Sequence, residues 1–143
     1  MSEPVSYKGH VGTTSGEFRE SVTAERISAF CRAVGARDRS VAPPTFMTIG
    51  RAGEFAILEK LDFPLKRILH AEQAYTYGEP LHAGDELFYR TTLTQVLEKR
   101  GGNGGMIFFV METTFEISRG GGDRLQAGMA KTNLLARFAA GEA

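Results

Sequence analysis

The chain has 143 residues, with 17 basic (Lys and Arg) and 17 acidic (Asp and Glu) side chains, so its formal net charge is zero. This balance argues against partners held by bulk electrostatics, such as nucleic acid or an anionic membrane surface. The single cysteine, Cys31, excludes an internal disulfide and fits a reducing compartment. No run approaches about 18 consecutive apolar residues, and residues 1–10 lack the apolar core of a signal peptide. We therefore expect one cytoplasmic domain, 1–143.

The first expected element is a helix over residues 23–35, which follows a polar, extended lead-in at 1–15. Thr23 can cap its N-terminus, and Gly35 stands where a glycine commonly ends a helix. Between these two residues one apolar stripe has helical spacing: Ile27, Phe30, Cys31 and Val34. The pattern predicts an amphipathic helix that packs on a core.

A second helix is expected over residues 44–61, where the pair Pro43-Pro44 favours a helix start. Gly50 and Gly53 lie inside it, and each glycine costs about 1 kcal/mol relative to alanine in a helix. Something must offset this cost, and the close approach of a neighbouring backbone or of a ligand would do so.

The rest of the chain alternates as β-strands do, over 68–77, 86–100, 106–118 and 124–138, before a flexible tail at 139–143. Strict alternation assigns the faces of the first two strands. One face of the first strand carries Leu69, Ala71, Gln73, Tyr75 and Tyr77. The other face carries His70 together with Glu72. One row of the second strand holds Leu87, Tyr89, Leu93 and Leu97.

Two glycine clusters, GGNGG at 101–105 and GGGD at 120–123, separate strands, and neither opens a helix or contains Gly-Lys-Ser/Thr. We interpret them as hairpin turns of an antiparallel meander rather than as phosphate-binding loops. Strands of about 12 or more residues must coil, and the glycine-bearing helix 44–61 is the element for them to wrap. The sequence thus predicts an α+β hot-dog fold, in which a long curled sheet surrounds one central helix.

Three stretches carry a resemblance to a known family: ISAFCRAVG before a loop, VAPPTF at the start of the central helix, and ILHAEQAYTYGEPLHAGDELFY. The chain resembles the N-terminal (FAS1-type dehydratase-like) hot-dog domain of MaoC-like dehydratases and (R)-specific enoyl-CoA hydratases, including the substrate-binding subunits of hydroxyacyl-ACP dehydratases. The stretches occur in the family's order, and the resemblance extends over most of residues 16–137. The resemblance implies an acyl-CoA or acyl-carrier-protein thioester as ligand, no cofactor, and hydro-lyase chemistry if the chain or its complex is active.

Catalytic members of this family carry Gly-Asp-x-Asn-Pro-x-His after the first helix, because the aspartate and histidine must act together on one carbon–carbon bond. Here Gly35 is followed by Ala36, Arg37 and Asp38, without Asn-Pro or a following histidine, and the helix-sized insert before APPTF is missing. Asp38 either takes the place of that aspartate or forms a solvated ion pair with its arginine neighbours. The resemblance therefore implies a binding subunit that acts beside a catalytic partner.

The catalytic candidates that remain are His70, Glu72 and Asp38. On one strand face, His70 and Glu72 would form either an orienting pair near a thioester or a polar pair at a sheet edge or dimer interface. The candidate substrate-binding residues are those that suit an acyl tunnel at the junction with a partner: His70, Gly50, Gly53, Tyr75 and Phe109. Three scattered histidines and one cysteine give no metal-ligand spacing, so no metal is expected.

The sequence leaves other functions open. Glu54 and Glu59 lie on the central helix, where some hot-dog thioesterases carry a carboxylate, although such a residue usually occupies the exposed flank. A stand-alone hydratase or thioesterase with a displaced site and a non-enzymatic acyl-CoA sensor or scaffold are the alternatives. Both faces of the strand 106–117 carry large apolar groups, which predicts a dimer, homo- or heteromeric, with His70 near the interface.

Overall fold

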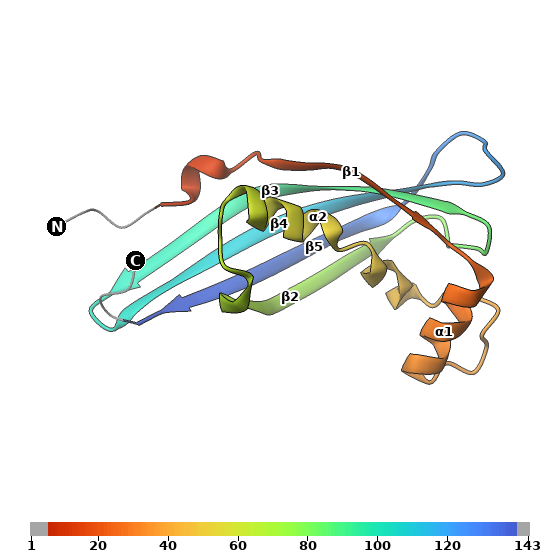
Figure 1. The fold of residues 1–143 in the computed structure, drawn as a ribbon, viewed down its shortest axis with the longest axis horizontal. Coiled ribbons are helices and arrows are strands. Elements are labelled where there is room, and N and C mark those ends of the chain that lie inside the picture. The colour runs from red at the N-terminus through yellow and green to blue at the C-terminus, as the bar shows by residue number, and fades with distance from the viewer. Residues whose placement is uncertain (1–5, 140–143) are drawn as a thin grey trace.

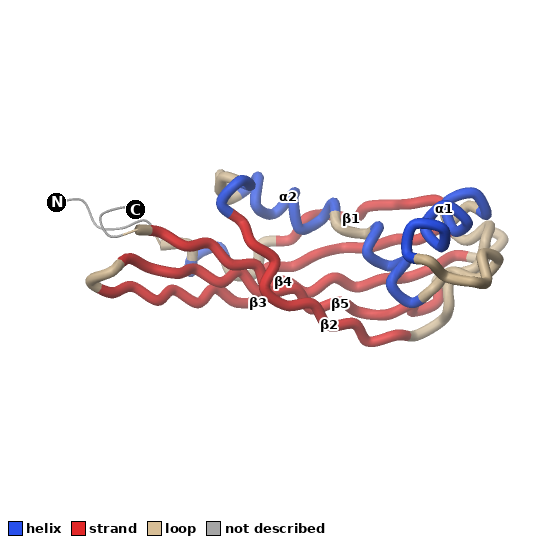
Figure 2. The backbone as a smooth tube through the Cα atoms, turned by 90° about the horizontal axis from the view of Figure 1, so that it is seen from below, coloured by secondary structure: helices blue, strands red, loops and turns tan. Residues whose placement is uncertain are grey.

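The computed structural model describes residues 6–139, and shows one five-stranded antiparallel sheet with the helices on one side of it (Figures 1 and 2). The remaining residues of the predicted lead-in and tail, 1–5 and 140–143, lie outside the described part. The α-helices are α1 (Ala24–Val34) and α2 (Ala52–Lys60), and short 3-10 helices span Lys8–His10, Pro44–Ile49 and Leu65–Arg67. The strands are β1 (Thr14–Ser21), β2 (Ile68–Tyr77), β3 (Glu86–Gly101), β4 (Gly104–Ser118) and β5 (Leu125–Phe138).

Helix α1 confirms the local signals in its sequence. The Thr23 side chain accepts a hydrogen bond from the Arg26 backbone N–H at 3.1 Å, and Gly35 ends the helix with a left-handed φ of 75°. Its apolar stripe packs Ile27 and Cys31 into the core. No helix among residues 6–139 is long and apolar enough to cross a membrane.

The predicted central helix 44–61 is divided into two pieces. A 3-10 helix covers Pro44–Ile49, the chain bends at Gly50 (φ −88°, ψ 60°), and α2 begins at Ala52. A Cβ atom at Gly50 would stand 2.5 Å from Cε1 of Phe115, a buried residue of β4. The segment thus approaches the sheet so closely at Gly50 that only a glycine fits there.

Gly53 allows a second close approach, between α2 and strand β3. A Cβ atom at Gly53 would overlap the Thr91 side chain and stand 3.0 Å from Ser15 Oγ. Thr91 is fully buried and bonds Thr113 at 2.8 Å, so it has no room to move. The two glycines therefore permit the helix to pack closely on the sheet. This close packing offsets the cost of placing glycines in a helix.

We expect Gly53→Ala to lower the free energy of unfolding by about 1–2 kcal/mol, because overpacking costs more than the gain in helix propensity. Chemical denaturation measures this difference. Gly102→Ala is the matched control, since its Cβ would meet no atom within 4 Å. An unchanged or increased stability of Gly53→Ala would mean that the helix does not touch β3 as described.

The strand order is β1-β3-β4-β5-β2, so β1 and β2 are the two edges of the sheet. β1 was not predicted: residues 14 and 15 belonged to the expected lead-in, and residues 16–21 were not assigned to any element. It pairs antiparallel with β3, and Phe18 lies opposite Tyr89 with the two rings stacked 5.7 Å apart. The strand forms because β3 offers it a backbone to pair with, which a local pattern cannot reveal.

Two β-bulges change which face the side chains take. In β3 the pairing register shifts between Leu93 and Gln95, and in β2 it shifts between His70 and Glu72. The prediction that Leu97 lies in one row with Leu87, Tyr89 and Leu93 is therefore wrong: Leu97 is on the outer face and is 39% exposed. Both bulges lie beside the same pair, Val110 and Asn133, where the sheet bends around the helices.

The alternation predicted for β4 is confirmed. One row is buried on the inner face: Ile107, Phe109, Met111, Phe115 and Ile117. Two clusters fill the space between the sheet and the helices. One gathers around α1 and the 3-10 helix Pro44–Ile49, and the other gathers around α2 and Phe63. The second cluster packs α2 against buried residues of β3, β4 and β5.

Candidate functional site

A chain of polar contacts runs from α2 across the sheet to the edge strand β2. Arg51 donates to Glu54 Oε2 from Nε at 3.1 Å and from Nη2 at 3.0 Å. Glu54 Oε1 lies 2.7 Å from the Thr132 hydroxyl on β5, which is also 3.0 Å from Gln73 Oε1 on β2. Gln73 Oε1 in turn lies 2.8 Å from His70 Nε2. We call these five residues the polar chain.

Glu54 is the buried member of the polar chain. Its side chain is 3% exposed, so the expectation that a glutamate on this helix occupies the exposed flank is wrong for Glu54. Glu59, by contrast, is exposed. A buried carboxylate must be paired or hydrogen-bonded, and the Arg51 guanidinium and the Thr132 hydroxyl meet that need.

The bulge in β2 decides which residue His70 contacts. His70 lies opposite Leu134, which is buried on the inner face, and Glu72 lies opposite the next residue of β5, Asn133, on the outer face. The prediction that His70 and Glu72 share one face is therefore wrong. The extra residue at the bulge puts His70 on the same face as Gln73, and these two form the pair.

Two tyrosines continue the inner face of β2 beyond the polar chain. The Tyr75 and Tyr77 rings are stacked, with centroids 5.8 Å apart. Burial, and next the negative charge of Glu54, raises the pKa of the Tyr75 hydroxyl above its ordinary value. Tyr75 therefore stays a neutral hydrogen-bonding group at neutral pH.

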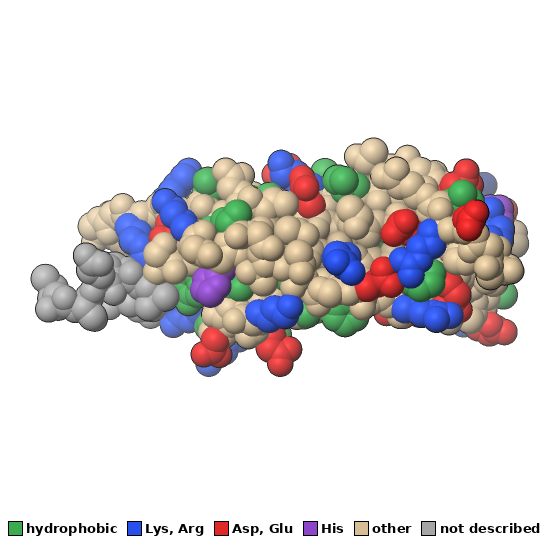
Figure 3. All heavy atoms as spheres, turned by 90° about the horizontal axis from the view of Figure 1, so that it is seen from above, with side chains coloured by type: hydrophobic (Ala, Val, Ile, Leu, Met, Phe, Trp, Pro, Cys, Tyr) green, Lys and Arg blue, Asp and Glu red, His purple; other side chains and the backbone are tan. Residues whose placement is uncertain are grey.

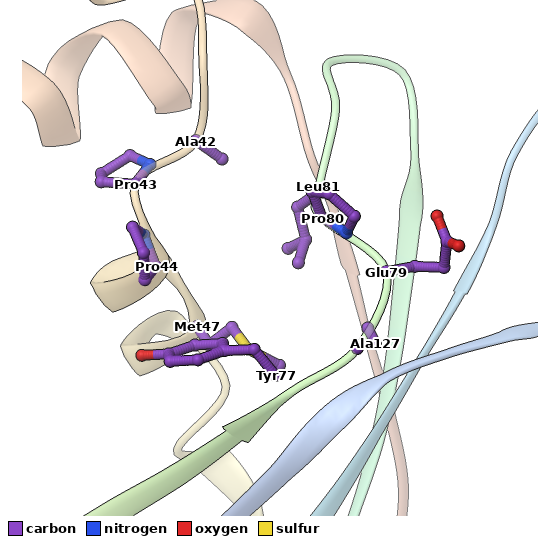
Figure 4. A pocket seen from close by; sticks show the side chains of 10 residues that line it. Ala42, Pro43, Pro44, Met47, Tyr77, Glu79, Pro80, Leu81 and Ala127 are labelled. Atoms are coloured by element: carbon purple, nitrogen blue, oxygen red, sulfur yellow. The ribbon is translucent and has the colours of Figure 1, made fainter.

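An apolar cavity of about 160 Å³ lies at the end of this face. Figure 4 shows Tyr77 and Met47 side by side on one wall, and the side chain of Glu79 pointing away from them. The start of the 3-10 helix with the loop before it, the turn after β2, and one residue of β5 complete the lining: Ala42, Pro43, Pro44, Gly78, Pro80, Leu81 and Ala127. The inner face of β2 thus joins a polar end at His70 to an apolar end at the cavity.

Asp38 is exposed in the loop after α1. Its Oδ1 accepts hydrogen bonds from the Ser40 hydroxyl at 2.6 Å and from the Ser40 backbone N–H at 2.9 Å. These two bonds hold the pKa of Asp38 below its ordinary value. The Asp38 carboxylate thus stabilises the turn in which it lies. Its partner is Ser40 rather than a neighbouring arginine.

The other predicted site residues lie in the packed interior. Phe109 is fully buried and packs edge-on against Phe63 at 5.1 Å and Tyr7 at 5.7 Å. Gly50 and Gly53 face the side chains of β4 and β3. Of the five predicted binding residues, the structure brings only His70 and Tyr75 together on one face. Phe109, Gly50 and Gly53 lie apart from these two.

Sequence reasoning did not select Arg51, Gln73 or Thr132. One signal could have found Gln73 and Thr132, because a polar residue on the inward row of a strand needs a buried partner. Arg51 lies three residues before Glu54, a spacing at which two side chains on a helix meet.

The described residues show no metal-binding group. Among residues 6–139 no three His, Cys, Asp or Glu side chains come together as ligands. His10 and His82 are exposed, and the backbone N–H of His82 donates to Asp85 at 2.8 Å. On the face drawn in Figure 3, acidic and basic side chains are interspersed rather than gathered by sign.

Comparison with known proteins supports a family. The sequence profile described as "FAS1-like, dehydratase domain region" matches residues 9–121. A UPF0336 protein of Cutibacterium acnes is 34% identical over 84 residues, which are 52% of this chain and 59% of that protein. The chain thus spans little more than half the length of that relative.

Solved structures confirm the predicted hot-dog fold. The HadBC complex of Mycobacterium tuberculosis, a 3R-hydroxyacyl-ACP dehydratase, has a TM-score of 0.64 at 21% identity, covering 89% of this chain and 97% of that chain. A MaoC-like dehydratase has a TM-score of 0.70 at 22% identity, covering 90% of this chain and 42% of that chain. With the profile match over most of its length, the chain belongs to the FAS1-like dehydratase-region family, and its fold is the hot-dog fold of these solved structures.

Proposed function

We propose that this chain binds acyl thioesters, carried by CoA or acyl-carrier protein, and acts beside a catalytic hot-dog partner in (R)-3-hydroxyacyl dehydration or enoyl hydration. One observation carries the proposal: the inner face of β2 joins a polar end at His70 to an apolar cavity beyond Tyr77. An acyl thioester has the same two ends, since an apolar chain follows a polar carbonyl.

The proposal assigns the chemistry to a partner because the loop after α1 does not supply it. Addition of water to an enoyl thioester needs a base and an acid on the same carbon–carbon bond. The loop from Gly35 to Pro43 has no histidine, and its Asp38 carboxylate bonds Ser40 at the surface. The likeness to the HadBC complex supports a second hot-dog chain as the partner.

Binding without turnover is the expected result for the purified chain. Calorimetry with crotonyl-CoA should show binding, while the absorbance of the enoyl thioester should stay constant. Tyr77→Ala should weaken the binding of a long-chain acyl-CoA more than that of crotonyl-CoA, because Tyr77 lines the cavity. Phe88→Ala on the outer face of β3 is the control. Hydration of crotonyl-CoA by the chain alone at enzyme-like rates would contradict the proposal.

A second candidate function is a stand-alone enzyme with a displaced site. The observation that favours it is the polar chain, which connects the buried Glu54 to the exposed His70. Under this alternative His70→Ala would abolish turnover while the melting temperature stayed within a few degrees. Undiminished turnover in that variant would remove His70 from the mechanism.

We further propose that the edge of β2 pairs with a second hot-dog chain, which would place His70 near the interface. β2 has a neighbouring strand on one side only among residues 6–139, and Leu69 and Tyr77 on it are 57% and 50% exposed. Light scattering at micromolar concentration should show a mass above that of the 15.6 kDa monomer. A clean monomer would exclude a stable homodimer and leave the heteromeric pairing, which native mass spectrometry of the protein from its own cell extract tests.

A further inference from the structure

The hydrogen-bonding roles in the polar chain can be worked out atom by atom, starting from Arg51. A guanidinium has donors only, and both of its contacts go to Glu54 Oε2. A carboxylate in an ion pair with a guanidinium can only accept hydrogen bonds, and Glu54 is in such a pair. The Thr132 hydroxyl, 2.7 Å from Glu54 Oε1, therefore donates its single proton to Glu54.

The orientation of Gln73 follows from that assignment. The carboxamide atom of Gln73 that contacts its two neighbours is assigned as Oε1. It lies 3.0 Å from Thr132 Oγ1 and 2.8 Å from His70 Nε2. Because the Thr132 proton is already used, the atom at this position must be a donor. A half-turn of the carboxamide puts the NH₂ group there, and an amide can take either orientation. Its two protons then serve the two neighbours, Thr132 Oγ1 and His70 Nε2.

The tautomer of His70 follows from the orientation of Gln73. A neutral imidazole has one protonated and one unprotonated nitrogen. Since Nε2 accepts from Gln73, the proton lies on Nδ1, whereas histidine in water prefers the opposite tautomer. His70 is exposed, and its Nδ1 has no hydrogen-bond partner among residues 6–139. The polar chain therefore presents one free N–H donor at the polar end of the inner face of β2.

We propose that Glu54, acting through Thr132 and Gln73, holds His70 in the Nδ1–H tautomer, and that this N–H donates to the carbonyl oxygen of a bound acyl thioester. The second part rests on the proposed function. Glu54, Thr132 and Gln73 are positioning residues, and His70 is the residue that touches the ligand. An acyl chain in the cavity beyond Tyr77 would lie along Tyr75 and bring its carbonyl toward His70.

Glu54→Gln should invert the tautomer. Arg51 cannot accept a hydrogen bond, so the new amide must keep its oxygen on Arg51 and present its NH₂ group to Thr132. The Thr132 hydroxyl then accepts from that amide and donates to Gln73, which must turn its oxygen toward His70. Nε2 of His70 then has to donate. The matched control is Glu59→Gln, the same chemical change at an exposed position of the same helix.

Long-range ¹H–¹⁵N correlation spectra of the full chain at about pH 8, above the usual titration range of histidine, identify the protonated ring nitrogen. We expect Nδ1–H for His70 in the native chain and in Glu59→Gln, and Nε2–H in Glu54→Gln. Gln73→Ala, on an edge strand, provides a second variant if Glu54→Gln does not fold, and it should show mainly Nε2–H. Mainly Nε2–H in the native chain, or an unchanged tautomer in the folded variants, would overturn the proposal.

Crotonyl-CoA, added to the same labelled sample, tests the donor role. We expect the His70 Nδ1 signal to shift on binding, with the signals of His10 and His82 unmoved. If calorimetry shows binding and the His70 signal does not shift, the donor role is wrong. If crotonyl-CoA and a long-chain acyl-CoA both fail to bind, the proposed function and the donor role of His70 are both wrong. The His70 tautomers in the native chain and in Glu54→Gln still test the hydrogen bonds of the polar chain.

Discussion

Phe109→Ala is expected to lower the free energy of unfolding by about 3–5 kcal/mol, the cost of truncating a well-packed buried phenylalanine. Phe109 is fully buried between Phe63 and Tyr7 on the inner face of β4. Removing its ring leaves a cavity with aromatic walls, and the long strands around it cannot collapse to fill the space. Chemical denaturation followed by circular dichroism measures the change.

The control for Phe109 is Phe55→Ala on α2. The Phe55 side chain is 46% exposed, so its truncation should change the free energy of unfolding by only about 0.5 kcal/mol. If Phe109→Ala instead cost less than about 1 kcal/mol, its ring would line an open space. That result would return Phe109 to the role of a tunnel residue, which the sequence suggested.

Arg119→Ala is expected to cost about 2–4 kcal/mol, because it removes the cationic partner of a buried carboxylate. Arg119 donates to Asp85 from Nε at 2.8 Å and from Nη2 at 3.0 Å, and Asp85 is 1% exposed. Nη2 also donates to the Pro80 carbonyl at 3.1 Å, so the pair ties the turn after β4 to the turn after β2. The Arg119 side chain is 40% exposed, which keeps the expected cost below that of a fully buried pair.

Arg124→Ala is the matched control for Arg119. Arg124 makes an equally short two-bond contact with Glu17, at 2.7 and 2.9 Å, but both side chains are more than a third exposed. Exposed ion pairs contribute about 0–1 kcal/mol, so this variant should be close to the native chain in stability. If Arg119→Ala and Arg124→Ala lowered the free energy of unfolding equally, the burial of Asp85 would not determine the cost of losing Arg119.

The same pair predicts how stability depends on pH. Burial by itself would raise the pKa of Asp85, but hydrogen bonds from Arg119 and from the His82 N–H outweigh it and hold the pKa below its ordinary value. A carboxyl whose folded pKa is depressed stabilises the fold above its unfolded pKa of about 3.9, and this stabilisation is lost as the pH falls toward the folded pKa. Asp85→Asn should thus be less stable than the native chain at neutral pH, and the difference should shrink on acidification below about pH 4. A difference that grows on acidification would contradict the assigned direction.

Much of the fold could be predicted from the sequence because the signals were short-range. The cap Thr23, the terminal Gly35 and the apolar stripe between them all act within three turns of α1. The alternation of β4 and the glycine-rich turns at its ends are equally local. Long strands must coil, and the glycine-bearing helix is the element around which they can coil. These two features together predicted the hot-dog fold.

The site was predicted only in part. His70 and Tyr75 were selected from the sequence, and the structure puts both on the inner face of β2. Glu72 was assigned as the partner of His70, and Gln73 takes that place in the structure. Arg51 and Thr132 were missed because nothing nearby in the sequence indicates that α2 and β5 come within hydrogen-bond distance.

The sequence by itself determined the elements whose interactions lie within a few residues: helix α1, the rows of β4 and the hairpin turns. Only the tertiary structure decided on which side of the sheet His70, Glu72 and Leu97 lie. Alternation assigns faces only while the pairing is regular, and one extra residue in a strand reverses every face beyond it. The two bulges arise where the sheet bends around the helices beside Val110 and Asn133. The helices reach the sheet through contacts between distant parts of the chain, such as that of Gly53 in α2 with Thr91 in β3.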